Sequence, residues 1–467
     1  MIYPRTFLIW GINMQWMGLA GIIVFMLMGY GLSCNRKKIH WKTIAWGLGL
    51  QWVLAFIILK GDLIQHSLSF IPVPPYLSWF ILVGACLPTM LKRLLKFQHQ
   101  VLNWSLFVLI IFGLLRLNLI GSAFDRMRIV VEGLMAYAGK GATFIFGPLQ
   151  PPNFFVFAFT VLPVIIFVAS VFGILYYLGI MQFIVGGAAK VMGQFLKISG
   201  AESVSVAASI MMGQTEAPLT IRPFLGKLTR SELMVVMTAG MAHVSGSIMV
   251  AYVQMAKVDI VHLLTAVIMT APGAVMMAKL IIPETEIPET QQGVAFRVDN
   301  KDANILDAAA RGAFDGGQLA FNVAVMLIAF ISLVALANGI LSALNPTWSL
   351  EAGLKVLFRP LALVMGVPSQ DATIVGGLLG KRMVINEFVA FAELGQIPLE
   401  QLSAHGRLIT TFALCGFANF SSIAIQIGGI GSLIPERRGD LANLGFRAMI
   451  AGTLANFISA CIAGVLT

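Results

Sequence analysis

The sequence predicts an all-α polytopic membrane protein, and three observations lead to that class. The chain is 58% hydrophobic and only 11% charged, whereas a soluble domain carries about 25% charged residues. Roughly ten apolar stretches reach or approach the length that crosses a bilayer as a helix. Two carboxylates, Glu216 and Glu387, nevertheless lie in apolar surroundings between Gly and Pro residues. Ionisable groups at membrane depth usually mark a substrate or ion path, so these two predict a site within the membrane.

The first region, residues 1–150, is predicted to consist of transmembrane helices, an additional helical hairpin and an interfacial helix. Apolar stretches at 6–33 and 43–59 are the clearest spans. The hairpin is expected at about 65–121, because prolines interrupt its start and a basic loop joins its two apolar arms. The interfacial helix is expected at 124–141, where charged residues are interleaved with apolar ones.

The second region, residues 151–467, is predicted to hold a scaffold and a core in which one order of elements occurs twice. A span at 154–180 precedes the polar-rich stretch 199–226 and a span near 233–253. A span at 317–344 precedes the stretch 372–398 and the span 408–434, which is interrupted by polar residues. Such weak internal symmetry is typical of inverted-repeat transporters. The stretches 199–226 and 372–398 are predicted re-entrant hairpins, because polar backbone at membrane depth needs protein or water around it.

Three further segments complete the chain. A span at 259–282 leads into an acid-rich, solvated connection at 283–312. That connection enters an amphipathic segment at 303–315, which precedes the span at 317–344. The last span is expected at 444–466.

The charge and cysteine patterns exclude other partners. The net charge of +10 lies mainly in short connections, in clusters around Arg36, Lys92, Arg222 and Arg437. An excess of Lys and Arg in cytoplasmic loops explains this charge, so no nucleic acid is expected as a partner. The four cysteines show no paired spacing, which argues against a disulfide or a metal site. No cofactor is expected.

The segment at 213–218 places an amide, a hydroxyl and a carboxylate side by side, in Gln214, Thr215 and Glu216. Together they offer donors and acceptors that can read the edge of a polar planar ligand such as a base. The alternative for Glu216 is a structural one, in which it bonds the free backbone N–H groups of its own hairpin.

The segment around Glu387 has different chemistry. A buried carboxylate that accepts from two adjacent hydroxyls is a good site for a sugar diol, because charge-assisted hydrogen bonds are strong. Glu387 also has the capping alternative. Asn419 and Ser422 are three residues apart and share a face if that segment is helical. Phe417 lies beside them and either stacks on a ligand ring or packs between helices.

Three segments resemble the signature segments of the concentrative nucleoside transporter family: 213–219 (Gly-Gln-Thr-Glu-Ala-Pro-Leu), 386–390 (Asn-Glu-Phe-Val-Ala) and 415–422 (Cys-Gly-Phe-Ala-Asn-Phe-Ser-Ser). Shorter matches at 271–273, 283–286, 366–368 and 435–439 extend the resemblance over roughly 150–467, and the first two spans fit as well. The hairpin at about 65–121 is a departure from the shorter bacterial members.

The resemblance implies a homotrimer of multi-pass protomers in a bacterial inner membrane, in contact with lipid. Each protomer would carry two re-entrant hairpins and two broken helices. It also implies roles for particular residues. Gln214, Thr215 and Glu216 match the residues that contact the nucleobase, and Ile248 matches an apolar contact. Glu387, Asn419 and Ser422 match the ribose site, and Phe417 matches the aromatic residue beside them.

The cation site implied by the resemblance is altered in this chain. Ser209 stands where the family usually has an Asn, and His243 stands where it has a Ser or Thr. Met212 and Val244 fill the positions that contribute backbone carbonyls. Sodium needs oxygen ligands, and imidazole is a poor ligand for a hard cation. The identity of any bound metal ion is therefore left unknown.

These patterns predict a secondary active transporter that imports nucleosides with a cation gradient. The altered cation site favours H⁺ as the coupling ion, and Na⁺ is the alternative. An intramembrane enzyme is the rival from another class, but the chain has no H-E-x-x-H motif and its six His residues are scattered. The preference for purine or pyrimidine nucleosides stays open.

Overall fold

The computed structural model describes residues 8–9, 12–69, 116, 119–147, 156–291 and 302–467. Most of the hairpin predicted at about 65–121 lies outside these residues, as does the predicted boundary at 150/151. The described chain is helical apart from two short antiparallel strands, β1 (Leu8–Ile9) and β2 (Ile12–Asn13). The prediction of an all-α protein is confirmed.

Seven helical stretches of the described chain are long and apolar enough to cross a membrane, judged by length and composition. They are α2 (Trp41–Leu59), α6 (Leu119–Phe146), α7 (Phe157–Tyr177), the pair α10 (Arg230–Ala242) and α11 (Gly246–Ala256), α12 (Ile260–Ile281), α13 (Ile305–Leu344) and α19 (Arg438–Leu466). The helices α1 (Met14–Gly31), α8 (Ile180–Leu196) and α18 (Phe420–Leu433) are shorter and also apolar. Short elements η1 (Arg36–Lys38), α3 (Gly61–Ser69) and η4 (Pro435–Arg437) lie in connections.

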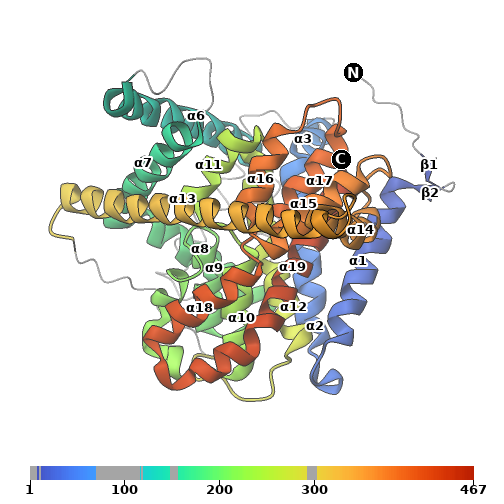
Figure 1. Cartoon of the computed structure of the whole chain (residues 1–467). Helices are drawn as coiled ribbons and strands as arrows, with labels where there is room; N and C mark the ends of the chain where they lie inside the picture. Colours follow the sequence, from blue (N-terminus) through green and yellow to red (C-terminus); the bar gives the residue numbers. More distant parts are fainter. Residues whose placement is uncertain (1–7, 10–11, 70–115, 117–118, 148–155, 292–301) are drawn as a thin grey trace.

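The core of the molecule forms around α10, α12 and α19, which pack against one another (Figure 1). All residues of α10 after Arg230 are buried, and so is most of α19 after Leu444. A helix that is buried on every side belongs to the interior of a large domain. The outer helices α1 and α2 cover this core on one side.

The helix α13 corrects the predicted division between an amphipathic segment at 303–315 and a span at 317–344. It is one continuous helix of 40 residues that crosses the front of the molecule and packs along α7. A side chain at Gly312 or Gly316 would meet the backbone of α7, at 2.6 Å from the Ala169 carbonyl and 2.9 Å from Ile166 Cα respectively. These glycines therefore allow two helices to approach closely, and they do not break the helix.

The helix α6 covers the segment predicted to lie on the membrane surface. It extends over 28 residues, which is also enough to cross a bilayer. Arg128 on α6 pairs at 2.8 Å with Asp259, whose side chain caps the N-terminus of α12. This ion pair fixes α6 to the core, and its interfacial placement stays a prediction.

Two copies of a hairpin followed by an interrupted helix make up the rest of the chain. In the first copy, α9 (Gly200–Ser209) turns back through 210–216 into the 3₁₀ helix η3 (Ala217–Lys227); we call 199–227 hairpin 1. In the second copy, α15 (Ala372–Val384) is followed by α16 (Glu387–Gln396); we call 371–396 hairpin 2. The helix α14 (Leu350–Val364) packs against α15.

Two interrupted helices are present, as the family resemblance implies. The first break, residues 243–245, separates α10 from α11. The second break, residues 415–419, separates α17 (Ala404–Leu414) from α18. The described fold thus contains two hairpins and two broken helices, and re-entry of the hairpins into a membrane stays a prediction.

Candidate functional site

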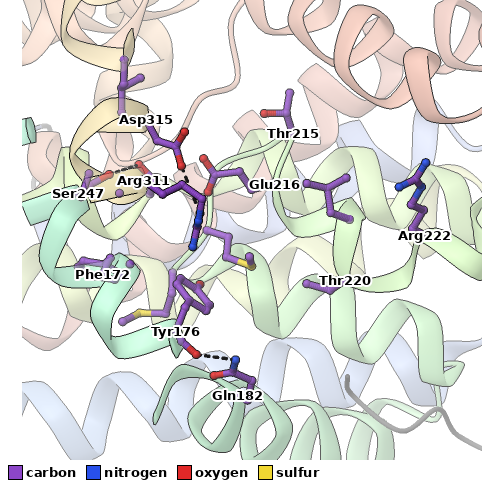
Figure 2. A pocket seen from close by; sticks show the side chains of 18 of the residues that line it. Phe172, Tyr176, Gln182, Thr215, Glu216, Thr220, Arg222, Ser247, Arg311 and Asp315 are labelled. Carbon is purple, nitrogen blue, oxygen red and sulfur yellow. Dashed lines mark hydrogen bonds and ion pairs between the residues drawn. The ribbon is translucent and has the colours of Figure 1, made fainter. Parts of the chain in front are cut away.

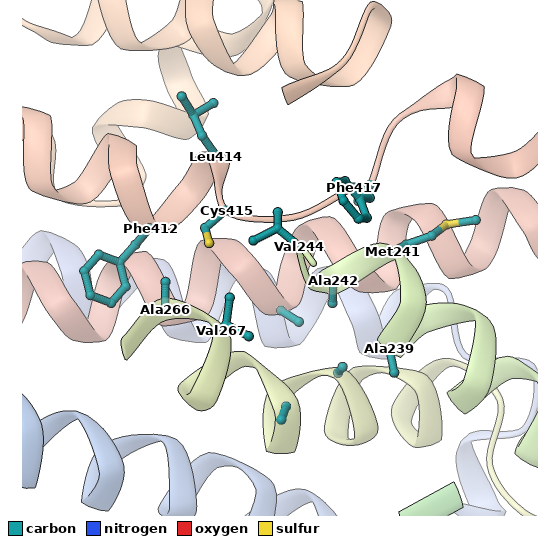
Figure 3. Close-up of a cluster of buried hydrophobic side chains, with 14 of the residues drawn as sticks. Ala239, Met241, Ala242, Val244, Ala266, Val267, Phe412, Leu414, Cys415 and Phe417 are labelled. Carbon is teal, nitrogen blue, oxygen red and sulfur yellow. The ribbon is translucent and has the colours of Figure 1, made fainter. Parts of the chain in front are cut away.

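The two breaks lie against each other in the middle of the core. The Phe417 N–H donates to the His243 carbonyl at 3.3 Å, so the second break crosses the first. Figure 3 shows the extended segment of Cys415 and Phe417 passing beside Val244 at the end of α10. Each half-helix that ends here leaves backbone carbonyls without partners inside the helix. Such crossing helix ends are the usual location of ligand and ion sites in transporters built from inverted repeats.

Glu387 is the best-connected carboxylate at this crossing. It is the first residue of α16 and only 5% exposed. The Tyr252 hydroxyl donates to Glu387 Oε1 at 2.9 Å, and the Asn419 amide donates to Oε2 at 2.9 Å. Each carboxylate oxygen has two lone pairs, so each can accept one more hydrogen bond. The arrangement is therefore suited to a ligand with two neighbouring hydroxyl groups.

Asn419 and Ser422 lie at the start of α18, and Asn419 contacts Glu387. Asn419 caps this helix, because its Oδ1 accepts from the Ser422 N–H at 2.9 Å. The capping bond explains why the interrupted helix resumes at Phe420. Phe417 is 8% exposed and Ile248 is 6% exposed, so both are packed into the core.

Gln214 joins hairpin 1 to this group. Its Nε2 donates to the Ser422 hydroxyl at 3.2 Å, across 208 residues of sequence. Its Oε1 is buried and has no hydrogen-bonding partner in the described structure. Buried polar atoms are nearly always paired, so this oxygen is available to a donor from a ligand or a water. Four of the residues predicted for base and sugar binding thus form one continuous polar chain: Gln214, Ser422, Asn419 and Glu387.

Glu216 and Thr215 are placed differently from Gln214. Glu216 is exposed to a cavity of about 1360 Å³ between hairpin 1, α7 and α13 (Figure 2). Its carboxylate accepts from the Gly213 N–H at 3.2 Å within the hairpin turn, and its side chain makes no bond that caps η3. Thr215 also lines the cavity and packs against Gly429 of α18. Hairpin 1 therefore presents one residue to the Glu387 group and two to the cavity.

Charged residues of α13 face the same cavity. Arg311 donates to both oxygens of Asp302, at 2.7 Å and 2.8 Å, and to Asp315 at 3.3 Å. The hydrogen bonds from Arg311 hold the pKa of the Asp302 carboxyl below its usual value. Arg311 and Asp315 interact electrostatically with Glu216 (Figure 2). The scaffold thus offers hairpin 1 both signs of charge across the cavity.

Ser209 and His243, the altered cation-site pair, are in direct contact. His243 Nδ1 lies 2.9 Å from the Ser209 hydroxyl and 2.7 Å from the Ala239 carbonyl. A carbonyl can only accept, so Nδ1 carries a proton, and Nε2 is buried without a hydrogen-bonding partner among the described residues. His243 is 1% exposed, Val244 is fully buried and Met212 is half-buried. The Ser209 hydroxyl also donates to the Val206 carbonyl at 2.7 Å, and the imidazole supplies nitrogen where a hard cation needs oxygen.

Three residues of this region were not identified from the sequence. Tyr252 contacts Glu387, and Arg382 and Asn456 connect hairpin 2 with both breaks. Asn456 is a polar residue within an apolar span, which is a usable signal for function. Arg382 follows Lys381 and resembles a loop cluster in the sequence, so only the structure separates the two.

The comparisons with known proteins agree with this geometry. Three family models match: "Na+ dependent nucleoside transporter N-terminus" over 20–72, "Nucleoside recognition" over 158–258 and "Na+ dependent nucleoside transporter C-terminus" over 262–464. The "Uncharacterized transporter YutK" of Bacillus subtilis is 44% identical over 347 residues, covering 72% of this chain and 84% of that protein. "Sodium/nucleoside cotransporter 1" of Rattus norvegicus is 33% identical and covers 97% of this chain and 64% of that protein.

A solved structure is also similar over nearly the whole chain. CNTnw in an inward-facing substrate-bound state aligns with a TM-score of 0.80 at 36% identity, covering 97% of this chain and 98% of the other. These homologues are nucleoside transporters and not enzymes, which confirms the prediction of a transporter over an intramembrane enzyme. The sequence and the fold together establish that the chain belongs to the concentrative nucleoside transporter family.

Proposed function

We propose that the protein is a multi-pass symporter that imports nucleosides across a bacterial inner membrane. The single observation that supports this most strongly is the polar chain Gln214–Ser422–Asn419–Glu387 at the crossing of the two breaks. Its ends differ chemically, with an amide at one end and a carboxylate at the other. A nucleoside has the same two parts, a base that presents amide-like groups and a sugar that presents hydroxyls.

The sugar binds at Glu387, Asn419 and Ser422, and the base binds toward hairpin 1. The free lone pairs of the Glu387 carboxylate accept from ribose hydroxyls. The unpartnered Gln214 Oε1 accepts from the base. Thr215 and Glu216 line the cavity through which the base approaches, and Ile248 and Phe417 supply apolar walls.

The coupling ion in this proposal is H⁺. The pair Ser209 and His243 supports it, because the two side chains bond each other and His243 keeps a bare Nε2 in a buried position. The Nε2 lone pair is the atom of His243 that could take up a proton. Glu216 is a second candidate for the proton, since it is a carboxylate that lines the cavity and bonds the Gly213 N–H.

Sodium is the alternative coupling ion, and the relatives favour it. Two matching family models are described as Na⁺ dependent, and a relative is named a sodium/nucleoside cotransporter. The alteration at Ser209 and His243 is the reason to depart from them. Backbone carbonyls at Met212 and Val244 would have to hold the ion if sodium is used.

Uptake of radiolabelled uridine into liposomes tests both parts of the proposal. We expect saturable uptake that unlabelled nucleosides compete, driven by an inward H⁺ gradient and unchanged when choline replaces Na⁺. The double substitution Ser209→Asn with His243→Ser should shift the dependence toward Na⁺. Strict Na⁺ dependence of the wild type at constant pH contradicts proton coupling and leaves nucleoside transport intact.

The proposal includes assembly as a homotrimer with a core that moves against a scaffold. The predicted regions, 1–150 and 151–467, and re-entrant hairpins at 199–226 and 372–398 belong to this proposal. The helix α13 supports it, because large apolar residues along it are exposed, such as Phe321, Ile328 and Leu336. Such a face is covered by lipid or by a neighbouring protomer. Mass measurement of the detergent-purified protein by light scattering tests the trimer.

A further inference from the structure

Arg382 is among the largest fully buried side chains of the described protein, with 1% of it exposed. It lies on α15, the first arm of hairpin 2, four residues before the hairpin turns at Asn386. A buried guanidinium is costly unless its donors are paired. Its hydrogen-bonding partners therefore indicate what the residue does.

Those partners are the ends of the two broken helices. Arg382 Nε donates to the Gly416 carbonyl at 3.3 Å, and Nη2 donates to Asn456 Oδ1 at 2.5 Å. Asn456, on α19, donates from Nδ2 to the Ala242 and Cys415 carbonyls, both at 2.9 Å. These carbonyls belong to the last residue of α10 and to the start of the second break. The cation thus lies at the negative ends of two half-helices, where positive charge is stabilised.

Hairpin 2 consequently holds the second break at two points. Arg382 holds it at Gly416, and Glu387 holds it at Asn419. Phe417 lies between these points and donates to the first break. Gly416 cannot be larger, since a Cβ there would lie 2.8 Å from the Ala242 carbonyl and would also collide with Asn456. The position of Asn419 relative to Glu387 is therefore set from both sides.

We propose that Arg382 is a positioning residue for the sugar subsite, acting through the second break and without touching the nucleoside. This inference rests on the proposed function, because it assumes that Glu387 and Asn419 bind the ribose. Arg382 fixes the break, the break fixes Asn419, and Asn419 orients the carboxylate. Loss of Arg382 should then affect discrimination between sugars more than discrimination between bases.

The test compares Arg382→Met with Lys381→Met in the full-length, detergent-purified protein. Lys381 is the matched control, because it is the adjacent cation on α15. It pairs with Glu393 at 2.5 Å, whereas Arg382 bonds the second break. The measured quantity is the ratio of the affinities for uridine and 3′-deoxyuridine. We expect Arg382→Met to lower this ratio about fivefold or more, and Lys381→Met to leave it unchanged.

Two further variants separate positioning from a general role in folding. Arg382→Lys keeps the charge and should restore part of the ratio, although it lacks the planar fork of Arg. In an Asn419→Ala background, Arg382→Met should lower the ratio no further, because residues acting through one group are not additive. An unchanged ratio in Arg382→Met, or full additivity with Asn419→Ala, overturns the inference. A wild type that binds neither nucleoside contradicts the proposed function instead.

Discussion

The two repeats are alike in order, but hairpin 2 has buried polar bonds at its tip as well as at its base, where Asp371 accepts from Ser403. In the first repeat, the base of hairpin 1 is held by a buried ion pair between Lys279 of α12 and Glu202, at 2.6 Å. The Ser199 hydroxyl also donates to Glu232 at the start of α10, at 2.6 Å. In the second repeat, the tip of hairpin 2 is held by Arg382 and by the partners of Glu387.

The tips of the two hairpins differ in the geometry of the turn and in the exposure of their glutamate. Hairpin 1 turns through 210–216 into a 3₁₀ helix that contains Pro218 and Pro223, and its Glu216 is exposed to the cavity. Hairpin 2 turns at 385–386 between two α-helices, and its Glu387 is buried. In the proposed function, this difference would give a rigid sugar side and a looser base side that can adapt to different bases.

The largest expected effect comes from the anchor at the base of hairpin 1. Lys279→Met leaves Glu202 and Glu284 without their buried partner, and breaking a buried pair costs about 3–5 kcal/mol. We expect a marked fall in the melting temperature of the purified protein. Lys227→Met is the control, because its ion pair with Glu289 is exposed and should contribute at most about 1 kcal/mol. Equal melting temperatures for the two variants would contradict the claim that the buried ion pair of Lys279 stabilises hairpin 1.

The second effect concerns the rigid tip. Glu387→Gln replaces a charged acceptor with an amide, and hydrogen bonds to charged groups contribute about 1.5–3 kcal/mol. Uridine affinity should fall about 10- to 100-fold, with all ribonucleosides weakened to a similar degree. Competition against labelled uridine measures this. An unchanged affinity in a well-folded variant contradicts the sugar subsite.

Tyr252→Phe should have a smaller effect on the same subsite. It removes the donor on Glu387 Oε1 and leaves the Asn419 donor in place. The carboxylate loses part of its orientation, so we expect uridine affinity to fall about three- to tenfold. Tyr137→Phe is the control, because Tyr137 is exposed on α6 and lies outside the residues that line the cavity. Identical affinities in both variants would show that Tyr252 only fills space.

The smallest change in affinity is expected at the tip of hairpin 1, together with a change in the order of preference among nucleosides. Gln214→Ala removes the bond to Ser422 and the free acceptor of the base side. Sites that hydrogen-bond a ligand discriminate by leaving groups unpaired, so the order of preference among nucleosides should change. If Gln214→Ala and Glu387→Gln lower every affinity by the same factor, the two repeats do not divide base from sugar.

The sequence predicted the membrane class, the repeated order of elements and the break at 415–419, which is marked by Asn419 and Ser422 within an apolar stretch. The break at 243–245 lies within a stretch predicted as a span, and only the family resemblance implied it. Contacts between distant residues could not be predicted, because a single sequence does not tell which carbonyls meet Asn456, 214 residues from Ala242. The role of a glycine such as Gly316 could not be predicted either. In the sequence it can mark the end of a helix, and only the structure shows that it allows close contact with α7.

The cavity beside hairpin 1 has a consequence for the solvent. A volume of about 1360 Å³ holds on the order of forty waters at about 30 Å³ each, far more than one nucleoside displaces. Any movement of hairpin 1 that closed this space against α13 would return most of that water to bulk. Transport would then depend on the activity of water as well as on substrate and ion, and an impermeant osmolyte would favour the closed form.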